Sequence, residues 1–232
     1  MKRKKVAGLI GTIVLLAAIG IGATLAYFTD TDTKTNEITM GDIDIGLSEP
    51  SFLEENAIGI VPNELIEKDP TITVKTGSKD AYIRAKVTYE WVSATGGKSA
   101  ITGGELEELK NNITWRSGWV ESTLEGEEDV WYYQNRVKED QKILLFDHVL
   151  IPNWGNKVAG KTLNITIEAA GIQADNFNPK RSDVELTDNV RVHHVIGGPQ
   201  NYEVVEGELT KFPNAIIGWH GATPENNQNN ND

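Results

Sequence analysis

The residues best suited to chemistry are the four histidines, of which only His193 and His194 are near each other in the sequence. Imidazole is a common metal ligand and general base. Adjacent residues of a β-strand point to opposite faces, so these two cannot bind one ion together. The HExxH motif of zinc-dependent peptidases is absent from the sequence. We therefore expect ordinary strand histidines, and we predict no metal ligand, no cofactor-binding residue and no catalytic residue.

Carboxylates form the second group of candidates. Asp42 and Asp44 lie on one face of a predicted strand, downstream of Asp30 and Asp32. Such a set could bind calcium, which takes about six to eight oxygen ligands. The EF-hand spacing is absent, however, and a solvated strand face explains the same residues, so we favour solvation. We also expect the acidic run at 125–129 (EGEED) to be a solvated loop.

The tryptophans are the third group, because indole rings can stack on sugars. Five of the six lie on or beside predicted strands: Trp91, Trp115, Trp119, Trp131 and Trp154. Aromatic residues are favoured there for their packing area alone. We expect most of them in the core or in cross-strand pairs.

The N-terminal stretch determines the compartment in which all these residues would act. A basic cluster at 2–5 precedes an uncharged apolar run that ends at about Ala26. This order is typical of a secretory signal peptide, and cleavage after Ala26 would leave Tyr27 as the mature N-terminus. A permanent membrane anchor is the alternative, because about 20 apolar residues can span a bilayer. No basic stop-transfer cluster follows, so we predict a signal peptide over 1–26, cleavage and export.

Composition excludes several classes of exported protein. The chain of 232 residues has no cysteine, so disulfide staples, thiolate metal sites and a cysteine nucleophile are excluded. Its formal net charge is −12, and removal of the basic leader makes the mature chain more acidic still. Nucleic acids are therefore not expected partners, and a membrane is expected to be one only before cleavage.

Hydrophobic alternation predicts an all-β domain over 42–177. Period-two patterns occur around 43–47, 72–74, 81–92 and 161–172, and we also expect strands in NITWRSGWV, DVWYYQN and KILLFDHVLI. The segment GELEELKNNI predicts one short helix. Strands joined by short polar loops indicate an antiparallel sandwich. We expect 178–223 to be a C-terminal extension, either extra strands or a surface arm, and 224–232 to be a disordered Asn-rich tail.

Four segments in this order resemble the TasA/camelysin family: LAYFTDTDTKTNEITMGDIDIGL, KDAYIRAKVTYEW, LLFDHVLIPNW and LNITIEAAGIQADNF. The resemblance covers residues 9–177. It implies a jelly-roll β-sandwich, exported by a Gram-positive bacterium, processed by a SipW-type signal peptidase and located in the extracellular matrix or at the cell surface. It also implies assembly into biofilm-matrix fibres, with other matrix proteins as further candidate partners.

The resemblance further implies a head-to-tail homopolymer, in which the mature N-terminal segment of one subunit becomes a strand of its neighbour. Carried onto this chain, the donor is 27–41, and its leading residues are Tyr27, Phe28, Thr29, Asp30, Thr31, Asp32 and Thr33. An extended peptide can add to a sheet edge through main-chain hydrogen bonds. Two alternatives stay open: a cell-surface metallopeptidase of camelysin type, and a monomeric surface adhesin or carbohydrate-binding module.

Overall fold

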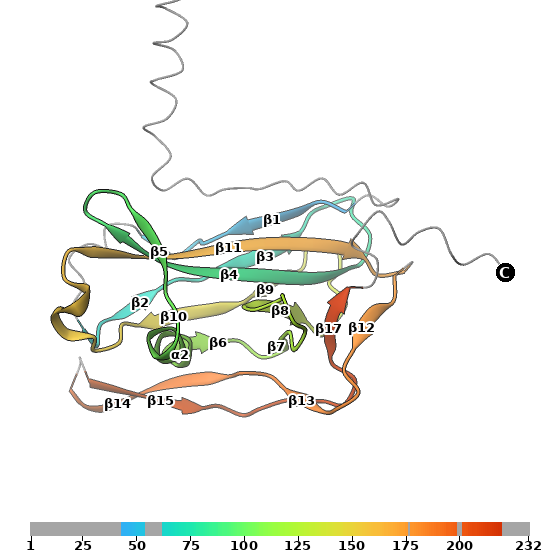
Figure 1. Cartoon of the computed structure of the whole chain (residues 1–232). Helices are drawn as coiled ribbons and strands as arrows, with labels where there is room; N and C mark the ends of the chain where they lie inside the picture. The colour runs from blue at the N-terminus through green and yellow to red at the C-terminus, as the bar shows by residue number, and fades with distance from the viewer. Residues whose placement is uncertain (1–42, 54–61, 176, 199–200, 220–232) are drawn as a thin grey trace, which may run out of the picture. The chain divides into compact units, whose positions relative to one another are not determined.

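Antiparallel β-strands make up most of the described chain in the computed structural model (Figure 1). The chain divides into two units, residues 1–33 and 34–232, and every described residue lies in the second. The structure describes residues 43–53, 62–175, 177–198 and 201–219. The predicted signal peptide, its cleavage site, the donor segment and the Asn-rich tail lie outside these residues. The predicted all-β sandwich is confirmed.

The first layer is built on two long strands that pair over their full length, β4 (Ala81–Ser93) and β11 (Lys161–Gln173). Along β4 the predicted alternation is confirmed, because Ile83, Ala85 and Val87 are buried whereas Lys86 is exposed. The sheet continues from β4 in the order β11-β4-β8-β7, with β5 also paired to β4. The added strands are β5 (Lys98–Ala100), β7 (Trp119–Glu121) and β8 (Val130–Tyr133).

The second layer contains two three-stranded sheets, β1-β3-β9 and β2-β10-β6. The backbone N–H of Leu145 donates to the Pro70 carbonyl (3.0 Å), and the N–H of Lys68 donates to the Asp147 carbonyl (3.1 Å). These bonds carry the ladder across the break, so the two sheets form one bent layer. Its strands are β1 (Ile45–Ser48), β2 (Leu65–Glu67), β3 (Thr71–Val74), β6 (Ile113–Trp115), β9 (Lys142–Leu144) and β10 (Phe146–Leu150).

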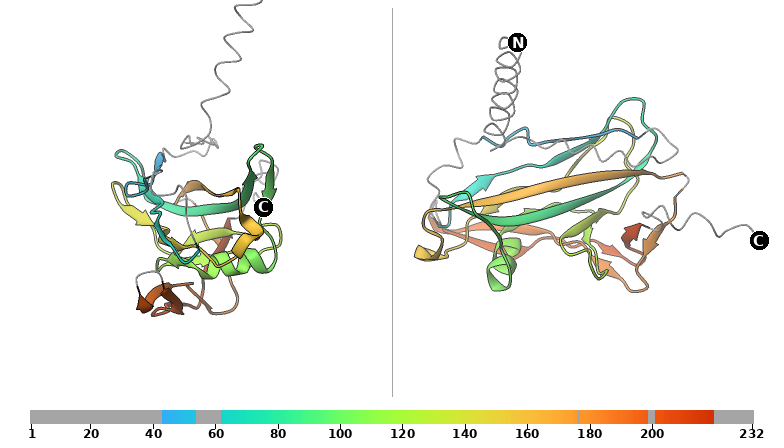
Figure 2. Two further views of the ribbon diagram at one scale, coloured as in Figure 1. Left: turned by 90° about the vertical axis from the view of Figure 1, so that its left-hand side faces the viewer. Right: turned by 45° about the horizontal axis from the view of Figure 1, so that its top comes forward.

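The layers are joined on one side where the chain passes from β6 to β7. Our expectation of one strand in NITWRSGWV was wrong, because the segment turns at Gly118, whose φ is 90°. A Cβ at Gly118 would lie 2.9 Å from Cε2 of Tyr133, so only glycine fits this corner. The indole N–H of Trp119 then donates to the Leu144 carbonyl of the opposite layer (2.9 Å). The end-on view in Figure 2 shows the layers curled around a shared interior.

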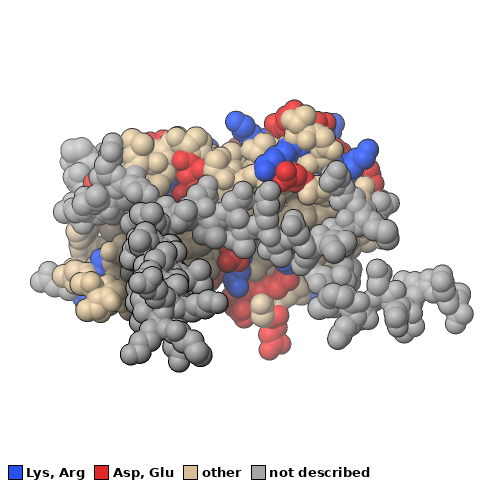
Figure 3. Space-filling model, turned by 90° about the horizontal axis from the view of Figure 1, so that it is seen from above, with Lys and Arg blue, Asp and Glu red and all other residues tan. Residues whose placement is uncertain are grey.

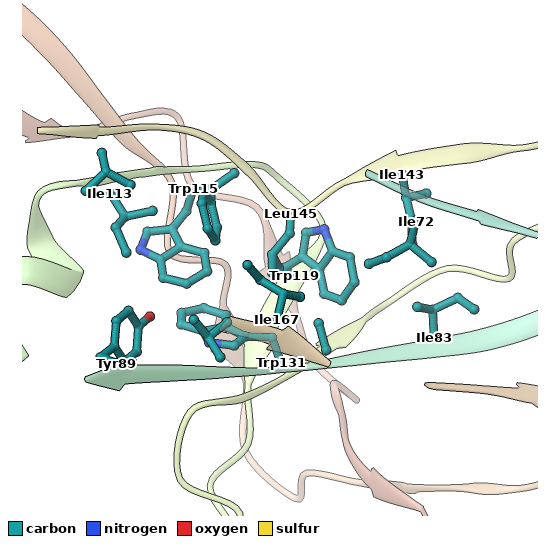
Figure 4. Packing of buried hydrophobic residues seen from close by; sticks show 14 of the residues in the cluster. Ile72, Ile83, Tyr89, Ile113, Trp115, Trp119, Trp131, Ile143, Leu145 and Ile167 are labelled. Atoms are coloured by element: carbon teal, nitrogen blue, oxygen red, sulfur yellow. The ribbon is translucent and has the colours of Figure 1, made fainter. Parts of the chain in front are cut away.

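Aromatic side chains fill that interior (Figure 4). The indole rings of Trp115 and Trp131 stack with centroids 3.9 Å apart, and Trp91 meets Trp154 edge to face at 5.1 Å. All four are buried, as is Trp119. The expectation that most tryptophans serve packing is confirmed, and these five rings are not exposed to a ligand.

The C-terminal part of the chain forms additional strands, of which β12 and β17 lie against the first layer and β14 lies against β6 of the second. Two clusters attach it, one around Ile216, Tyr132 and Ile172, and another around Ile217 and Val120. Figure 1 shows β14 and β15 on the side of α2 and β6. The strands are β12 (Pro179–Arg181), β13 (Leu186–Thr187), β14 (Arg191–Gly198), β15 (Asn201–Glu206), β16 (Lys211–Phe212) and β17 (Ile216–Trp219).

Helices are short in this unit. The predicted helix is present as α2 (Gly104–Asn111), which buries Leu109 and carries Glu105 and Glu107 in its first turn, where they complement the helix dipole. A single 3-10 turn, η2 (Gly155–Val158), precedes β11. Among the described residues, no helix has the length and apolar character needed to cross a membrane.

Candidate functional site

Two sheet edges face the same seam of the sandwich, one from β1 and one from β11. β1 is the terminal strand of its sheet and pairs with β3, and β11 is the terminal strand of the other layer and pairs with β4. An edge strand presents unpaired N–H and C=O groups to any added strand. Within the described chain no strand pairs with the outer edge of either one.

The side chains along this seam are apolar but incompletely covered. Most of those on the inner faces of the two strands contact the core yet are only half-buried, although Ile167 of β11 is buried. The β3 partners of β1, Ile72 and Val74, are fully buried. Half-covered apolar groups beside an open edge are what an added strand would bury. The half-buried set is Ile43, Ile45, Leu47, Leu163, Ile165 and Ala169.

Gly171 closes one end of the seam. A Cβ at Gly171 would lie 3.1 Å from Cγ2 of Ile45 and 3.3 Å from Cγ2 of Ile43, so β1 and β11 approach closely there. Beyond that point β1 ends after 4 residues, whereas β11 is 13 residues long. Most of the β11 edge therefore has no neighbour in the described chain. We call this stretch, residues 161–169 together with residues 43–47, the acceptor seam.

The start of β1 is fixed to the turn between β3 and β4. The backbone N–H of Lys75 donates to the Asp44 carbonyl (2.8 Å), and the Asp44 N–H donates to Oγ of Ser78 (3.0 Å). The Asp44 carboxylate is exposed and lies 3.2 Å from Nζ of Lys75. The expected solvated face holds for Asp44, whereas Asp30, Asp32 and Asp42 lie outside the described residues. The chain upstream of residue 43 thus leaves from an anchored point at the seam.

The surface charges on the seam side of the molecule favour neither a positively nor a negatively charged partner. Seen from above, basic and acidic side chains are interspersed in the described part of the surface, with uncharged residues between them (Figure 3). No single-sign field would therefore steer an incoming segment toward the visible part of this face. Recognition along the seam would rest on backbone pairing and apolar burial.

His193 and His194 point to opposite sides of β14, as expected for adjacent residues of a strand. The imidazole of His193 contacts the Asn112 carbonyl through Nε2 (3.0 Å) and Oγ1 of Thr114 through Nδ1, whereas His194 is exposed. Burial lowers the pKa of His193, with a smaller opposing effect from the Asn112 hydrogen bond. His193 therefore joins the hairpin to β6 as a neutral ring.

No group of three or more metal-ligating side chains occurs among the residues that the structure describes. The His148 ring lies 3.1 Å from the carboxylate of Asp147, which also binds Arg116. Both ring nitrogens of His193 are already in contact with the chain. His193 therefore has no ring nitrogen left for a metal ion.

The prediction of a solvated loop at 125–129 holds for Glu125 and Glu128, which are exposed. It was wrong for Glu127 and Asp129, which are bonded. Nζ of Lys110 lies 2.8 Å from Asp129 and also binds Glu121, and these contacts tie α2 to β7 and β8. Burial acts to lower the pKa of Lys110, but the hydrogen bonds to both carboxylates outweigh it and raise that pKa. Glu127 accepts from the hydroxyl of Tyr132 (3.0 Å), and burial raises the pKa of Tyr132 to about 12. Two of the four carboxylates in the run are thus bonded parts of the fold.

Sequence reasoning recognised β11 as a strand but did not identify it as an edge. Alternation shows which side chains share a face and is the same for a central and a terminal strand. The weak signal was Gly171, an interior glycine that marks a close approach. The bonding role of Asp129 carried no such signal.

One comparison with known proteins gave a match. A family model described as camelysin metallo-endopeptidase matches residues 1–100, which reach from the N-terminus through β5. This match supports the assignment to the TasA/camelysin family, and it covers less than half of the chain. No curated protein and no solved structure matched the chain.

Proposed function

We propose that this chain, a member of the TasA/camelysin family by its first 100 residues, is an exported structural subunit that polymerises by donor-strand exchange. The donor is the mature N-terminal segment, 27–41, and the receptor is the acceptor seam of the next subunit. The observation that carries the proposal is the seam itself, two unpaired edges in the described chain with half-buried apolar side chains.

An extended donor would present one uncharged face to the seam. A strand added beside β11 would place alternate side chains toward the half-buried Leu163 and Ile165. Main-chain hydrogen bonds to the free edge would supply affinity whatever the side chains are. One face of the donor carries Tyr27, Thr29, Thr31 and Thr33, and the other carries Phe28, Asp30 and Asp32.

Covalent connection gives the assembly its direction. The donor precedes β1 directly in the sequence, so it is covalently joined to the strand that forms one side of the seam. Such a head-to-tail contact does not close on itself and generates filaments. Cleavage after Ala26 by a SipW-type signal peptidase is the switch, because a leader held in the membrane keeps the donor from a neighbour's seam. The product belongs to an extracellular matrix.

Electron microscopy and sizing of two purified forms test the proposal. One form begins at Tyr27, and the other lacks residues 27–41. Filaments from the first and folded monomers from the second are expected. A synthetic peptide of residues 27–41 should bind the truncated form, and a peptide of scrambled sequence is the control. Monomers from both forms, or filaments from both, would contradict the proposal.

Metal-dependent proteolysis is the second candidate, because the matching family model carries the name of a metallo-endopeptidase. Against it stands that the described residues include no group of three or more metal-ligating side chains, and that both ring nitrogens of His193 contact the chain. The candidate is tested by incubating the form that begins at Tyr27 with casein, with and without a chelator. Cleavage that the chelator abolishes and zinc restores would establish it.

A further inference from the structure

The face of the β14–β15 hairpin that points toward the sandwich carries several polar side chains. Register pairs Arg191 with Glu206 and His193 with Val204, so these four side chains share one face with Tyr202. This face points inward, because His193 contacts Asn112 and Thr114 of the main sandwich. Figure 1 shows the hairpin beside α2 and β6.

A cavity of about 470 Å³ lies between this face and the ends of α2 and β10. Its walls include the side chains of Asn63, Asn111, Asn112, Asn153, Arg191 and Tyr202. A volume of this order is in the usual range for small-ligand sites. Arg191 and Glu206 also line a second hollow of about 270 Å³. We call these two neighbouring hollows the cleft.

The polarity of the cleft distinguishes it from a docking interface. The other end of the C-terminal extension is sealed by apolar residues, among them Ile216 and Ala215, which are fully buried. Beneath the hairpin the wall instead combines carboxamides, a phenol and charged groups with the apolar side chains of Leu150 and Val204. Ligand sites are hollows in which polar groups converge among apolar ones, whereas packed protein contacts leave no hollow of this size.

The residue types define the ligand. Each carboxamide offers both donors and an acceptor, which matches the hydroxyl groups of a sugar. The Tyr202 ring offers a flat apolar surface of the kind that packs on a sugar ring. Arg191 is bonded to Glu206 (3.3 Å) and to Oδ1 of Asn111 (3.4 Å), so its charge is compensated. Glu108 adds a negative charge to the wall, so an anionic polymer would be repelled.

We propose that this cleft binds an uncharged oligosaccharide chain, with Tyr202 and the carboxamides as the contact residues. Two hollows that share Arg191 and Glu206 favour several linked sugars over a single one. The site lies on the hairpin side of the sandwich and uses no residue of the acceptor seam. Saccharide binding and strand exchange can therefore succeed or fail separately.

Calorimetric titration of the mature chain with cellohexaose and chitohexaose tests the site. Saturable binding of at least one probe is expected, with hexagalacturonate bound at least about tenfold more weakly because of its charge. Tyr202→Ala should weaken binding about tenfold or more, and Tyr202→Phe should retain it. Asn153→Ala should weaken it less, because one carboxamide is removed. Glu203→Gln, on the opposite face of the same hairpin, is the matched control and should bind as the parent does.

Thermal unfolding of each variant ensures that a loss of binding is not a loss of fold. No saturable binding of either neutral probe would overturn the proposal. Equal binding by the parent and Tyr202→Ala would also overturn it, since the saccharide would then lie elsewhere. Preference for the galacturonate would refute the charge argument on which the choice of an uncharged ligand rests.

Discussion

The two faces of strand β11 differ in how well their apolar side chains are covered. On its outer face Ile172 is 9% exposed, because the C-terminal extension packs there with Ile216. On its inner face Ile167 is as well buried, but Leu163 and Ile165, nearer the start of the strand, are only half-buried. In an isolated sandwich the inner face is normally the better covered one. The difference shows that the seam lacks a neighbour within the described chain, although its residues are as apolar as those on the outer face. We call the outer face, where Ile216 packs with Ile172 and Tyr132, the sealed flank.

The sealed flank is held by specific polar bonds as well as by apolar burial. The Gln134 carboxamide accepts from the Ile216 N–H (2.7 Å) and donates to the Ile216 carbonyl (3.0 Å), so a side chain replaces a strand partner. The Arg84 guanidinium lies 4.5 Å from the centroid of Trp219. The acceptor seam has no comparable cover within the described residues. The sealed flank is covered by residues of its own subunit, whereas the acceptor seam, by our proposal, is covered by a strand from the next subunit.

The largest loss of stability is expected from Trp131→Ala, which removes one large ring from the centre of the core. Trp131 is fully buried and stacks on Trp115, so the cavity should lower the free energy of unfolding by about 3–5 kcal/mol. Urea denaturation measures it. Trp219→Ala on the sealed flank is the comparison and should cost less, because Trp219 is half-buried. An equal cost for both would show that the core is not the main source of stability.

Ile165→Lys should separate assembly from stability. Its side chain is half-buried, so the folded monomer should lose about 1 kcal/mol or less, whereas a charge in the seam should abolish filaments. Glu168→Lys is the control on the same strand, because Glu168 is exposed on the outer face. Electron microscopy and urea denaturation are read together. Filaments from Ile165→Lys would move the acceptor away from this seam.

Asp188→Ala should loosen the sealed flank. The buried carboxylate accepts from the Ser117 hydroxyl (2.6 Å) and from the Thr210 N–H (2.7 Å), so its loss leaves donors unsatisfied and should cost about 1–3 kcal/mol. Hydrogen exchange should show the C-terminal strands opening before the sandwich. Asp183→Ala, at an exposed position of the same segment, should leave exchange unchanged. Uniform acceleration over the whole domain would argue against a separately attached extension.

The smallest expected effect is a pH dependence of the unfolding free energy that comes from His193 in the β14–β15 hairpin. Because burial lowers the pKa of His193 below its unfolded value of about 6.5, the unfolded state binds more protons. This stabilisation is fully present above that pH and is lost as the pH falls through the lowered folded value. The difference in unfolding free energy between parent and His193→Gln should therefore shrink on acidification. A difference that grows toward low pH would mean that the protonated ring is the favoured form.

The sequence allowed prediction of the parts of the fold that depend on local periodicity. The alternation in 81–92 predicted β4, and the apolar spacing of Leu106 and Leu109 predicted α2. Corners were missed, because the turn at Gly118 depends on packing against Tyr133, a contact that the sequence does not show. A similar corner divides KILLFDHVLI at Leu145, where two consecutive residues are buried.

Long-range polar bonds were missed for the same reason. Asp129 and Lys110 are far apart in the sequence, and Asp188 reaches the β6–β7 turn from the C-terminal extension. Surface carboxylates and bonded carboxylates have the same sequence signature. The acceptor seam was partly within reach, because the apolar alternation of 161–172 was visible. Its status as an edge depends on strand order, which alternation does not encode. The donor segment, the cleavage site and the fibre remain predictions.

Site-specific cross-linking tests the central claim most directly, because the chain has no cysteine of its own. One preparation carries Thr31→Cys in the donor segment. It is mixed during assembly with a second preparation that carries either Thr166→Cys on β11 or Ser99→Cys on β5, and is then oxidised. Disulfide formation requires Cα atoms about 4.4–6.8 Å apart. Donor-strand exchange predicts intermolecular bonds to position 166, alternating in strength as the donor cysteine is moved one residue at a time, and none to position 99. Filaments that form without any bond to position 166, or that cross-link equally at both positions, would contradict the account.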